Sequence, residues 1–590
     1  MKQRYRILLW AALAALLLTG CTAQPADTAG GKSTDTSVSS RDGYGTTSKE
    51  GTTAVSRYTD SDSSVSSQTQ SADSSGTQPQ PADRLRPLVF PSAVRTLEER
   101  RISSADFLSR AVQSGYDGMK HRAGTNVIVS PYFTAEADGV MLPVYATPVY
   151  VANGNRGAFH SFASVDVEFG ARRSLQLRIR VASGIACTSA VTLAADEVKT
   201  ELRDDTVTLT VSAHGVYTVL LNDSQDTAVT VFVREYTDED AEIAAYRRQY
   251  GDDRVIVYEP GLHEIDYVLM TRDNTVLYLK AGAILLPRHT LDIQSDTDAS
   301  ARQEPNAQAL NMLGLNRYPV VNGFERKGLR ILGRGTVDMT GMDWHERRGL
   351  VFSGCENVTV EDVTVINPCE WSMIFYRCKN VRVSGCAVLG YRTNSDAFAV
   401  CNTVGAEVTD CFARTGDDMF EVKTLGGPDD AVCRSVRFAR CQAWGSKARC
   451  FGVTGEIERD ISDVVFEDSI VIWRDAVWDN NRIGSLVVIR ENGRGTVSDI
   501  TFRNIRIYRD EGRAINCVNY TPDLTGSVTE RVRFEQITYR AFMPSQCRLG
   551  DGSNRLQVVL RDVTANGAVL TRDTLSSGFI WDREGLVSVE

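Results

Sequence analysis

The sequence predicts an all-β fold in which an antiparallel β-sandwich precedes a right-handed parallel β-helix. Short alternating apolar runs separated by turn residues fill residues 86–240, as a sandwich requires. From residue 329 onward, strand-like segments repeat in a loose register, which is typical of a solenoid. The 590 residues are enough for more than one folded unit, each with its own core.

The first 21 residues have the composition of an export signal. A basic start is followed by an apolar stretch at 7–18, which is too short to remain as a membrane-spanning helix. Leu18-Thr19-Gly20-Cys21 also resembles the bacterial lipobox, in which Cys21 would carry acyl chains that anchor the protein to a membrane. The alternative is a cleaved signal with an accidental cysteine. The segment predicts a lipid-anchored protein of the bacterial cell envelope that faces the exterior or the periplasm.

Residues 22–85 are rich in Ser, Thr, Asp, Gln and Gly and contain hardly any large apolar side chains. Such a segment cannot bury enough surface to offset its ordering entropy, so we expect a disordered tether. The whole chain has 65 Lys and Arg against 75 Asp and Glu, a net charge of −10. This balance argues against a nucleic-acid partner, because nucleic-acid-binding proteins usually carry a basic patch.

The segment 86–240 shows period-2 alternation rich in Thr and Val, for example at 175–181 and 206–212. No paired catalytic residues stand out in it, so we interpret it as a structural module; contact with carbohydrate is the alternative. Residues 238–249 have the pattern of a short connecting helix. The β-helix is predicted to occupy 250–590.

A small or medium-sized residue recurs at one position of eight segments, in steps of 23 to 36 residues: Val363, Cys386, Cys411, Cys441, Ser469, Ile505, Ile537 and Val563. A stacked interior ladder needs this pattern, with insertions confined to the corners. The ladder cysteines are predicted to be buried free thiols, with disulfides between coils as the alternative. No CxxC pair or Cys/His cluster occurs, so no metal is expected.

Three aspartates are predicted to meet on adjacent coils. The following strand of each coil superposes without gaps over four segments, 372–376, 396–400, 418–422 and 449–453. Stacked strands lie about 4.8 Å apart, so Asp396 and Asp418 should be near neighbours, with Asp417 beside them. The alternation of side chains along a strand is not reliable through a bend, so it does not decide which of Asp417 and Asp418 faces the cleft. By alternation, Glu421 is expected to face solvent.

Clustered carboxylates raise one another's pKa, because like charges disfavour joint ionisation. One carboxyl can then stay protonated as a general acid while others remain charged and hold a water, as glycoside hydrolysis requires. The alternative is that these aspartates cap turns at strand ends.

Asn394-Ser395-Asp396, followed one coil later by Gly416-Asp417-Asp418, resembles the paired motifs of the polygalacturonase-type enzymes of glycoside hydrolase family 28. The Pro-Trp segment at 367–371 and the Gly-Arg-Gly segment at 333–338 resemble the family's preceding coils. The sandwich and the turn at 259–263 are more similar to the dextranases of family 49, which share the β-helix and a site of three aspartates. The resemblance implies that Asp417 is the general acid, that Asp396 and Asp418 position the attacking water, and that the reaction inverts the anomeric centre.

Two departures from the pectin-cleaving pattern bear on the substrate. The Gly-His-Gly motif of those enzymes is replaced near Ser446-Lys447-Ala448-Arg449, and no histidine follows His345. The Arg-Ile-Lys segment with which those enzymes bind the uronate carboxylate is matched only weakly by Val488-Ile489-Arg490. This weak match argues against polygalacturonate as the substrate.

Further residues are candidates for substrate binding because of their place near the acids: Asn394, Trp371, Glu421, Lys423, Lys447, Arg449 and Arg490. For the basic ones, solvated positions on the coil surface are the alternative. Indole faces suit sugar rings, but core packing is the more common role of Trp371, Trp444, Trp473 and Trp478.

Together these features predict an exported, lipid-anchored, monomeric glycoside hydrolase that cleaves a polysaccharide or oligosaccharide without a cofactor or metal. One rival is a β-helix polysaccharide lyase, which would need Ca²⁺ on a carboxylate cluster and an Arg or Lys base. The other rival is a non-catalytic glycan-binding surface protein on the same scaffold.

Overall fold

The computed structural model describes residues 84–113, 117–118, 125–152, 155–170, 173–289, 319–426, 431–445, 447–476, 482–519 and 525–590. The predicted signal with Cys21, and nearly all of the predicted tether, lie outside these residues. Of the helices within them, none has the length and apolar character needed to cross a membrane.

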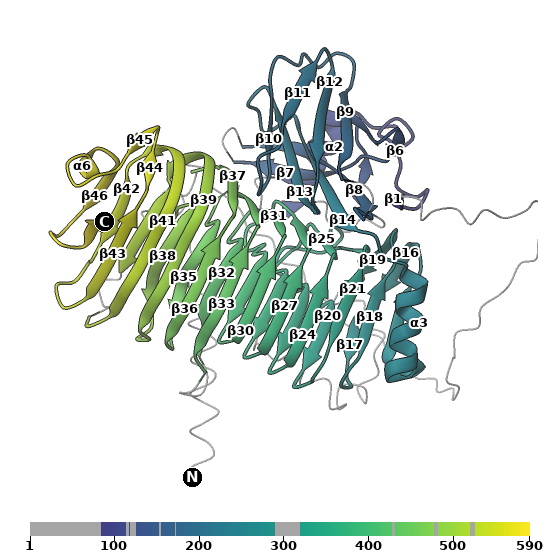
Figure 1. Cartoon of the computed structure of the whole chain (residues 1–590). Coiled ribbons are helices and arrows are strands. Elements are labelled where there is room, and N and C mark those ends of the chain that lie inside the picture. Colours follow the sequence, from purple (N-terminus) through teal and green to yellow (C-terminus); the bar gives the residue numbers. More distant parts are fainter. Residues whose placement is uncertain are drawn as a thin grey trace, which may run out of the picture. The chain divides into compact units, whose positions relative to one another are not determined.

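The N-terminal part is a sandwich of two sheets (Figure 1). One sheet contains β10 (Ala190–Leu193), β13 (Gly215–Leu221), β14 (Ala228–Glu235), β8 (Arg156–Val167), β7 (Tyr145–Val151) and β4 (Ile128–Val129) in this order, with β1 (Leu85–Pro87) also on β8. The other contains β11 (Thr200–Arg203), β12 (Thr206–Val211), β9 (Leu175–Val181), β5 (Phe133–Ala137) and β6 (Val140–Leu142). Outside the two sheets lie α2 (Ser104–Ala111) and the pair β2 (Val112–Gln113) and β3 (Asp117–Gly118).

The sandwich core is built by strict alternation. In β9 every second residue is buried, and these side chains meet the inner faces of β8, β13 and β14. The prediction of an antiparallel sandwich is confirmed with one exception, because β14 pairs with β8 in parallel.

Helix α3 (Glu239–Tyr250) follows the sandwich, close to the predicted 238–249. Asp238 is its N-cap and accepts a hydrogen bond from the Ala241 amide at 3.1 Å. Its buried Ile243 packs on Val255, Val276 and other residues of the first coils. The helix therefore packs on the outer face of the first strands of the first coils and covers their outward apolar residues. A short 3₁₀ turn, η1 (Asp252–Arg254), leads into the first strand.

The C-terminal part is a parallel β-helix whose coils stack in sequence order, from teal to yellow in Figure 1. A typical coil contributes two strands to a 22-stranded sheet and a third strand to an 11-stranded sheet. The 11-stranded sheet contains β17 (Val268–Met270), β20 (Val321–Phe324), β23 (Leu350–Ser353), β26 (Met373–Tyr376), β29 (Phe398–Cys401), β32 (Phe420–Thr424), β35 (Phe451–Ile457), β38 (Leu486–Asn492), β40 (Ile515–Asn519), β42 (Ser545–Arg548) and β46 (Phe579–Trp581).

The 22-stranded sheet carries the first and second strands of the coils. It contains β15 (Val255–Tyr258), β16 (Gly261–Ile265), β18 (Val276–Leu279), β19 (Ala283–Pro287), β21 (Arg330–Gly333), β22 (Thr336–Asp338), β24 (Glu356–Glu361), β25 (Thr364–Ile366), β27 (Lys379–Ser384), β28 (Ala387–Leu389), β30 (Val404–Thr409), β31 (Phe412–Thr415), β33 (Cys433–Ala439), β34 (Gln442–Gly445), β36 (Ile461–Glu467), β37 (Ile470–Arg474), β39 (Val497–Arg513), β41 (Val528–Met543), β43 (Arg555–Arg561), β44 (Thr564–Ala565), β45 (Ala568–Val569) and β47 (Val587–Val589). Helix α6 (Leu575–Gly578) precedes β46.

The predicted ladder is confirmed. The strand registers place its eight residues on top of one another at the first corner, between the first and second strands of each coil, and all are buried. The residue before each has positive φ: Asp362, Gly385, Asp410, Arg440, Asp468, Asn504, Gln536 and Asp562. A left-handed residue turns the chain sharply, so the next side chain points inward.

One register prediction was wrong by a single residue. Met373, and not Ile374, pairs with Phe398, whereas the later segments pair as expected, with Phe398 on Phe420 and Phe420 on Phe451. A one-residue slip would have turned the inward row of β26 outward. The three phenylalanines stack in the core, with centroids 5.0 and 4.8 Å apart.

The sandwich packs against the second strands of the coils. Strand β27 is alternately exposed and buried, but β28, β31 and β34 are buried at every position. Their outward side chains, such as Phe412 and Trp444, join a cluster with Phe162 and Phe232 of the sandwich. Buried polar contacts cross the same interface, including Thr218 Oγ1 to Gln442 Oε1 at 2.8 Å.

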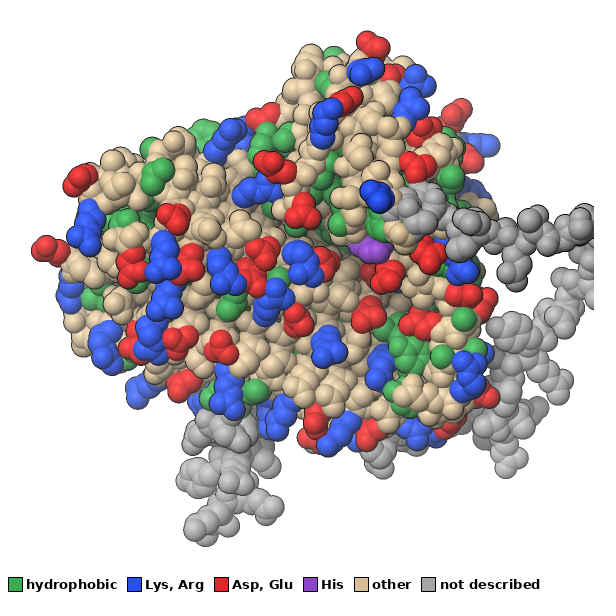
Figure 2. Space-filling model, viewed as in Figure 1, with side chains coloured by type: hydrophobic (Ala, Val, Ile, Leu, Met, Phe, Trp, Pro, Cys, Tyr) green, Lys and Arg blue, Asp and Glu red, His purple; other side chains and the backbone are tan. Residues whose placement is uncertain are grey.

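The exposed first strands carry ion pairs instead. Arg437 binds Glu407 at 2.8 Å and Glu467 at 2.6 Å, and Glu467 also pairs with Arg503. Basic and acidic side chains are intermixed over the face shown in Figure 2. The visible face therefore lacks the continuous basic patch of a nucleic-acid-binding surface.

The cysteines that the structure describes have free thiols, and all except Cys187 are buried. Burial raises the pKa of Cys433 to about 12 and of Cys369 to about 11, so these thiols stay protonated and unreactive. They serve as small apolar packing groups in the stack.

Candidate active site

The acids gather at the second corner, between the second and third strands of a coil. Asp396 lies just before β29, Asp417 and Asp418 lie just before β32, and Lys447 and Arg449 lie just before β35. These third strands are consecutive neighbours in the 11-stranded sheet. The stacking of coils thus brings together residues that are far apart in sequence, as predicted for the three aspartates.

Two local features fix the corner. Gly416 lies against the preceding coil, where an added Cβ would be 2.2 Å from the Arg392 carbonyl oxygen, so no larger residue fits. Asn394 has φ 61°, and its amide donates to Asp417 Oδ2 at 2.9 Å. Asn394 Oδ1 lies 2.8 Å from His345 Nε2. Asn394 therefore acts through its backbone on Asp417 and through its side chain on an earlier coil.

Asp417 is the most exposed of the three acids, at 9% against 3% for Asp396 and 1% for Asp418. Its Oδ1 also accepts from the Asp418 amide at 3.0 Å. Burial, together with the charge of Asp418, raises the pKa of Asp417 to about 6. Asp417 therefore keeps its proton to a higher pH than a free aspartate does, and a small part of its surface remains exposed.

Asp418 has the opposite electrostatic character. Its Oδ2 receives Arg449 Nη1 at 2.9 Å, and its Oδ1 receives the Arg449 amide at 3.2 Å. Burial by itself would raise the pKa of Asp418, but the charges of Arg449 and Lys423 outweigh it and lower the pKa. Arg449 is held in turn by Glu491 at 2.6 Å. Asp418 is therefore the more readily ionised of the two acids, and Asp417 keeps its proton to a higher pH.

Lys423 is surrounded by carboxylates. Its Nζ lies 2.8 Å from Glu421, 3.4 Å from Asp396, 3.7 Å from Glu456 and 3.8 Å from Asp418. These charges overcome the effect of burial and raise the pKa of Lys423 well above its ordinary value. The ammonium group is therefore a permanent cation at the centre of the acid cluster.

Asp396 has one oxygen on Lys423 and one, Oδ1, that is buried without a hydrogen-bond partner among the described residues. Burial and the charges of Glu421 and Asp417 raise the pKa of Asp396 well above its ordinary value. Buried polar atoms normally have a partner. The unpaired oxygen can accept a hydrogen bond from a water or a substrate hydroxyl.

The expectation that Glu421 faces solvent was wrong. Its side chain points away from the helix core, as alternation requires, but it is 0% exposed and bonds Thr454 Oγ1 at 2.8 Å as well as Lys423. Outward neighbours on the same sheet, such as Ile374 and Ala399, are also buried beneath Trp371 and other side chains. Burial raises the pKa of Glu421 to about 7. Glu421 thus positions Lys423 and does not lie on the surface.

Carboxylate oxygens of Asp396, Asp418 and Glu421 lie within 4.8 Å of one another, which is close enough to share a metal ion. The Lys423 ammonium already lies among them, and a second cation there would be repelled. A second set, His289, Asp343 and Glu346, has the same spacing, with His289 Nδ1 2.9 Å from Glu346 Oε2.

Lys447 joins the site from the next coil. Its Nζ donates to Thr393 Oγ1 at 3.1 Å and lies 4.7 Å from the ring centroid of Tyr150. Burial lowers the pKa of Lys447 to about 8, against the opposing influence of Asp417. Tyr150 belongs to β7 of the sandwich. The sequence analysis did not predict that Tyr150, Glu456 and Glu491 belong to the site. Nothing in the sequence indicates a contact between positions so far apart.

Of the other residues predicted to bind substrate, one lies beside the acids and another is engaged elsewhere. Trp371 lies beside the cluster, with Lys423 Nζ 4.5 Å from its ring centroid. Arg490 donates to the carbonyl oxygens of Gly493, Gly495 and Val528, so its guanidinium holds a loop. Trp444 and Trp473 are buried in the interface with the sandwich. Trp478 and Ser446 lie outside the described residues.

Neighbouring carboxyls whose pKa values are driven apart are the arrangement that acid–base hydrolysis uses. Asp417 combines a retained proton with access to the surface. Asp418 and Asp396 supply acceptor oxygens one coil apart, next to a fixed cation. The corner can therefore donate a proton to a leaving group while it orients a water.

Comparison with known proteins agrees with this chemistry. Residues 290–545 match the family described as glycosyl hydrolases family 28. A probable polygalacturonase of Arabidopsis thaliana is 23% identical over 310 residues, which are 46% of this chain and 64% of the relative. The polygalacturonase of Chamaecyparis obtusa is 22% identical over 235 residues, 36% of this chain and 43% of the relative. The chain thus spans less than two thirds of the length of either curated relative.

Among solved structures, Dex49A from Penicillium minioluteum superposes with a TM-score of 0.52 at 11% identity, covering 80% of this chain and 96% of that one. This similarity is one of fold, and it extends over sandwich and β-helix alike. The match to the family model, over residues 290–545, includes the coils that carry the acids. Over residues 290–545 the protein thus resembles glycosyl hydrolases family 28, and it is similar in sequence to polygalacturonases, on a right-handed β-helix.

Proposed function

We propose that the protein hydrolyses a glycosidic bond of a polysaccharide or oligosaccharide at the second corner of the β-helix. Asp417 donates a proton to the leaving oxygen, and Asp396 and Asp418 orient the attacking water. The observation that carries the proposal is the contrast between two adjacent acids, with the pKa of Asp417 raised to about 6 and that of Asp418 lowered.

The proposed stereochemical outcome is inversion. Asp396 and Asp418 are bound by Lys423 and Arg449, which lower their nucleophilicity and favour their use as hydrogen-bond acceptors for water. The distinguishing measurement is the anomeric form of the first product, followed by NMR before mutarotation.

The position of Lys423 supports hydrolysis over the lyase alternative. A lyase of the predicted type would bind Ca²⁺ on the carboxylate cluster, where the ammonium group already lies 2.8–3.8 Å from three of the acids. Hydrolysis needs no metal, and its products absorb no ultraviolet light. Release of unsaturated products that depends on calcium would support the lyase instead.

Two substrate classes are to be tested, an acidic polysaccharide and a neutral glucan. The curated relatives are polygalacturonases, which suggests a plant-type acidic polysaccharide. Arg490 binds backbone carbonyls, and the stretch near Ser446-Lys447-Ala448-Arg449 contains no histidine, so the contacts to the reacting sugar are expected to differ from the pectin-cleaving pattern. A dextran-like neutral chain is the second substrate to test, because of the fold shared with Dex49A.

The deciding experiment is a glycan panel scored for new reducing ends. Wild type is compared with Asp417→Asn and with Asp410→Asn, a control at a left-handed corner residue of the same coil that is paired with Arg440. We expect activity in wild type and the control, and a loss of about 10²–10⁴-fold in Asp417→Asn. Full activity of Asp417→Asn would contradict the proposed role of Asp417. Glycan binding without turnover in wild type would favour the non-catalytic alternative.

We also propose that the enzyme is a monomer, exported and anchored through acyl chains on Cys21, with the segment at 22–85 as tether. The support is the basic and apolar composition of the first 21 residues. Metabolic labelling with a radioactive fatty acid should mark the wild type and not Cys21→Ser. Equal labelling of both would show that the lipid, if any, is elsewhere.

A further inference from the structure

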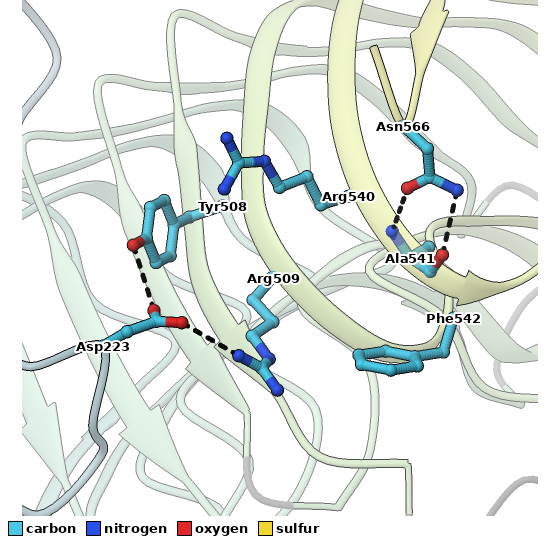
Figure 3. Close-up of a pocket in the computed structure, with 7 residues that line it drawn as sticks. All are labelled: Asp223, Tyr508, Arg509, Arg540, Ala541, Phe542 and Asn566. Carbon is cyan, nitrogen blue, oxygen red and sulfur yellow. Dashed lines mark hydrogen bonds and ion pairs between the residues drawn. The ribbon is translucent and has the colours of Figure 1, made fainter. Parts of the chain in front are cut away.

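A cavity of about 400 Å³ lies on later coils than the acids, along the last part of β39 and β41 and beside the sandwich (Figure 3). Its lining includes Tyr508 and Arg509 of β39, which is followed by β40, and Arg540 and Phe542 of β41, which is followed by β42. In the 11-stranded sheet, β40 and β42 are the third and fourth strands after β32, which follows Asp417 and Asp418. At about 4.8 Å per coil, the cavity begins roughly 14 Å along the helix axis from the acids.

The side chains of this cavity are open, in contrast to those around the acids. The Phe542 ring is 68% exposed, although large apolar side chains are usually covered. The Arg540 guanidinium is exposed and has no carboxylate partner among the described residues, and it lies 5.9 Å from the Tyr508 ring centroid. An aromatic face beside an unpaired cation suits a sugar ring that carries a carboxylate.

Other lining residues are held by hydrogen bonds. Asp223, from the hairpin between β13 and β14 of the sandwich, accepts hydrogen bonds from Tyr508 Oη and Arg509 Nη1, both at 3.0 Å. Asn566 bonds both the amide and the carbonyl of Ala541, at 2.9 and 3.1 Å. Figure 3 shows the contacts of Asp223 on one side and those of Asn566 on the other, with Phe542 on the same side as Ala541. The only carboxylate in the lining is thus neutralised.

We propose that this cavity is a distal binding site for a carboxylate-bearing stretch of the saccharide whose reacting bond lies at the acids. Arg540 binds the carboxylate, Phe542 packs against the sugar ring, and Tyr508 and Arg509 form the wall. The site rests on the proposed hydrolase function only for its link to the acids; its binding chemistry stands on the cavity itself. It places the acidic sugars of the substrate away from the cleaved linkage, where the chain lacks a uronate clamp.

The test measures binding without turnover. Long oligogalacturonate is titrated by calorimetry into Asp417→Asn, and into the same variant with Arg540→Ala or Phe542→Ala added. We expect each added change to weaken binding roughly three- to tenfold. Methyl-esterified oligogalacturonate should bind more weakly to the parent and should not respond to Arg540→Ala. Arg533→Ala, an exposed arginine on the same strand β41, is the matched control and should bind as the parent does.

The outcomes separate this proposal from the function. No binding of oligogalacturonate by Asp417→Asn, or equal binding by parent and cavity variants, would overturn the distal site even if wild type hydrolyses glycans. Weakened binding in the cavity variants would support the site even if no glycan in the panel is cleaved. Loss of binding in Arg533→Ala as well would indicate a diffuse charge effect and would also overturn it.

Discussion

The acid corner and the distal cavity lie on different coils of one β-helix and are built in opposite ways. Around the acids, almost every charge is buried and bound: Lys423 has four carboxylate neighbours, and Arg449 has two. In the cavity, Arg540 and Phe542 are exposed and loosely held. Chemistry requires charges in fixed positions with shifted pKa values, whereas binding of a sugar chain requires open faces. The difference matches the proposed division between reaction at the acids and recognition at the distal cavity.

Removing a water-orienting acid should have the largest effect. We expect Asp396→Asn to lower the rate of hydrolysis by about 10²–10⁴-fold, because a neutral amide no longer attracts the proton of the attacking water. Thermal unfolding checks that the protein is folded. A variant with wild-type activity would exclude Asp396 from the reaction.

Lys423 and Arg540 form a matched pair for stability. Lys423→Met leaves four carboxylates without their common cation, and should lower the free energy of unfolding by about 3–5 kcal/mol. Arg540→Met removes an exposed charge and should change it by less than about 0.5 kcal/mol. Urea unfolding of both variants gives the comparison. Similar values for the two would contradict the described contrast between the two sites.

The pH dependence follows from the direction of the pKa shifts. Asp417 must be protonated to act, and its pKa is raised to about 6, so kcat/KM should fall by about tenfold per pH unit above that value. Asp418 must be ionised, and because its pKa is lowered, its own ionisation does not limit activity at the acid end of the profile. A profile that stays flat well above pH 6 would argue against Asp417 as the acid.

The smallest expected effect comes from Lys447. Its positive charge favours the ionised form of Asp417, so Lys447→Met should move the alkaline limb upward by a fraction of a pH unit. Lys379→Met, an exposed lysine on β27, is the control and should leave the limb in place. A downward movement would show that Lys447 does not interact with Asp417 in this way.

The repeat made most of the β-helix predictable from the sequence. Ladder residues such as Cys386 and Cys411 recur once per coil, and stacking follows from that register without further information. The same logic placed Asp396 and Asp418 on adjacent coils. The predicted register was wrong by one residue at β26. The number of residues in the corner before Met373 cannot be read from the periodic pattern, so the pattern did not show which residue of β26 pairs with Phe398.

Contacts between the two parts of the chain were not predictable. Burial of Glu421 and the approach of Tyr150 to Lys447 depend on what covers the outer surface of the coils, and alternation only states which way a side chain points. The sandwich, interpreted from its sequence as a structural module, contributes Tyr150 to the acid corner and Asp223 to the distal cavity. Its role in the site became visible only in three dimensions.

The most direct test of the account is the dependence of Asp417→Asn on the leaving group. The substrate found in the glycan panel is compared with an aryl glycoside of the same sugar, whose acidic phenol departs without protonation. We expect the rate of hydrolysis by Asp417→Asn to fall by about 10²–10⁴-fold on the natural linkage and to stay close to the wild-type rate on the aryl glycoside. An equal loss on both substrates would contradict the assignment of Asp417 as the proton donor.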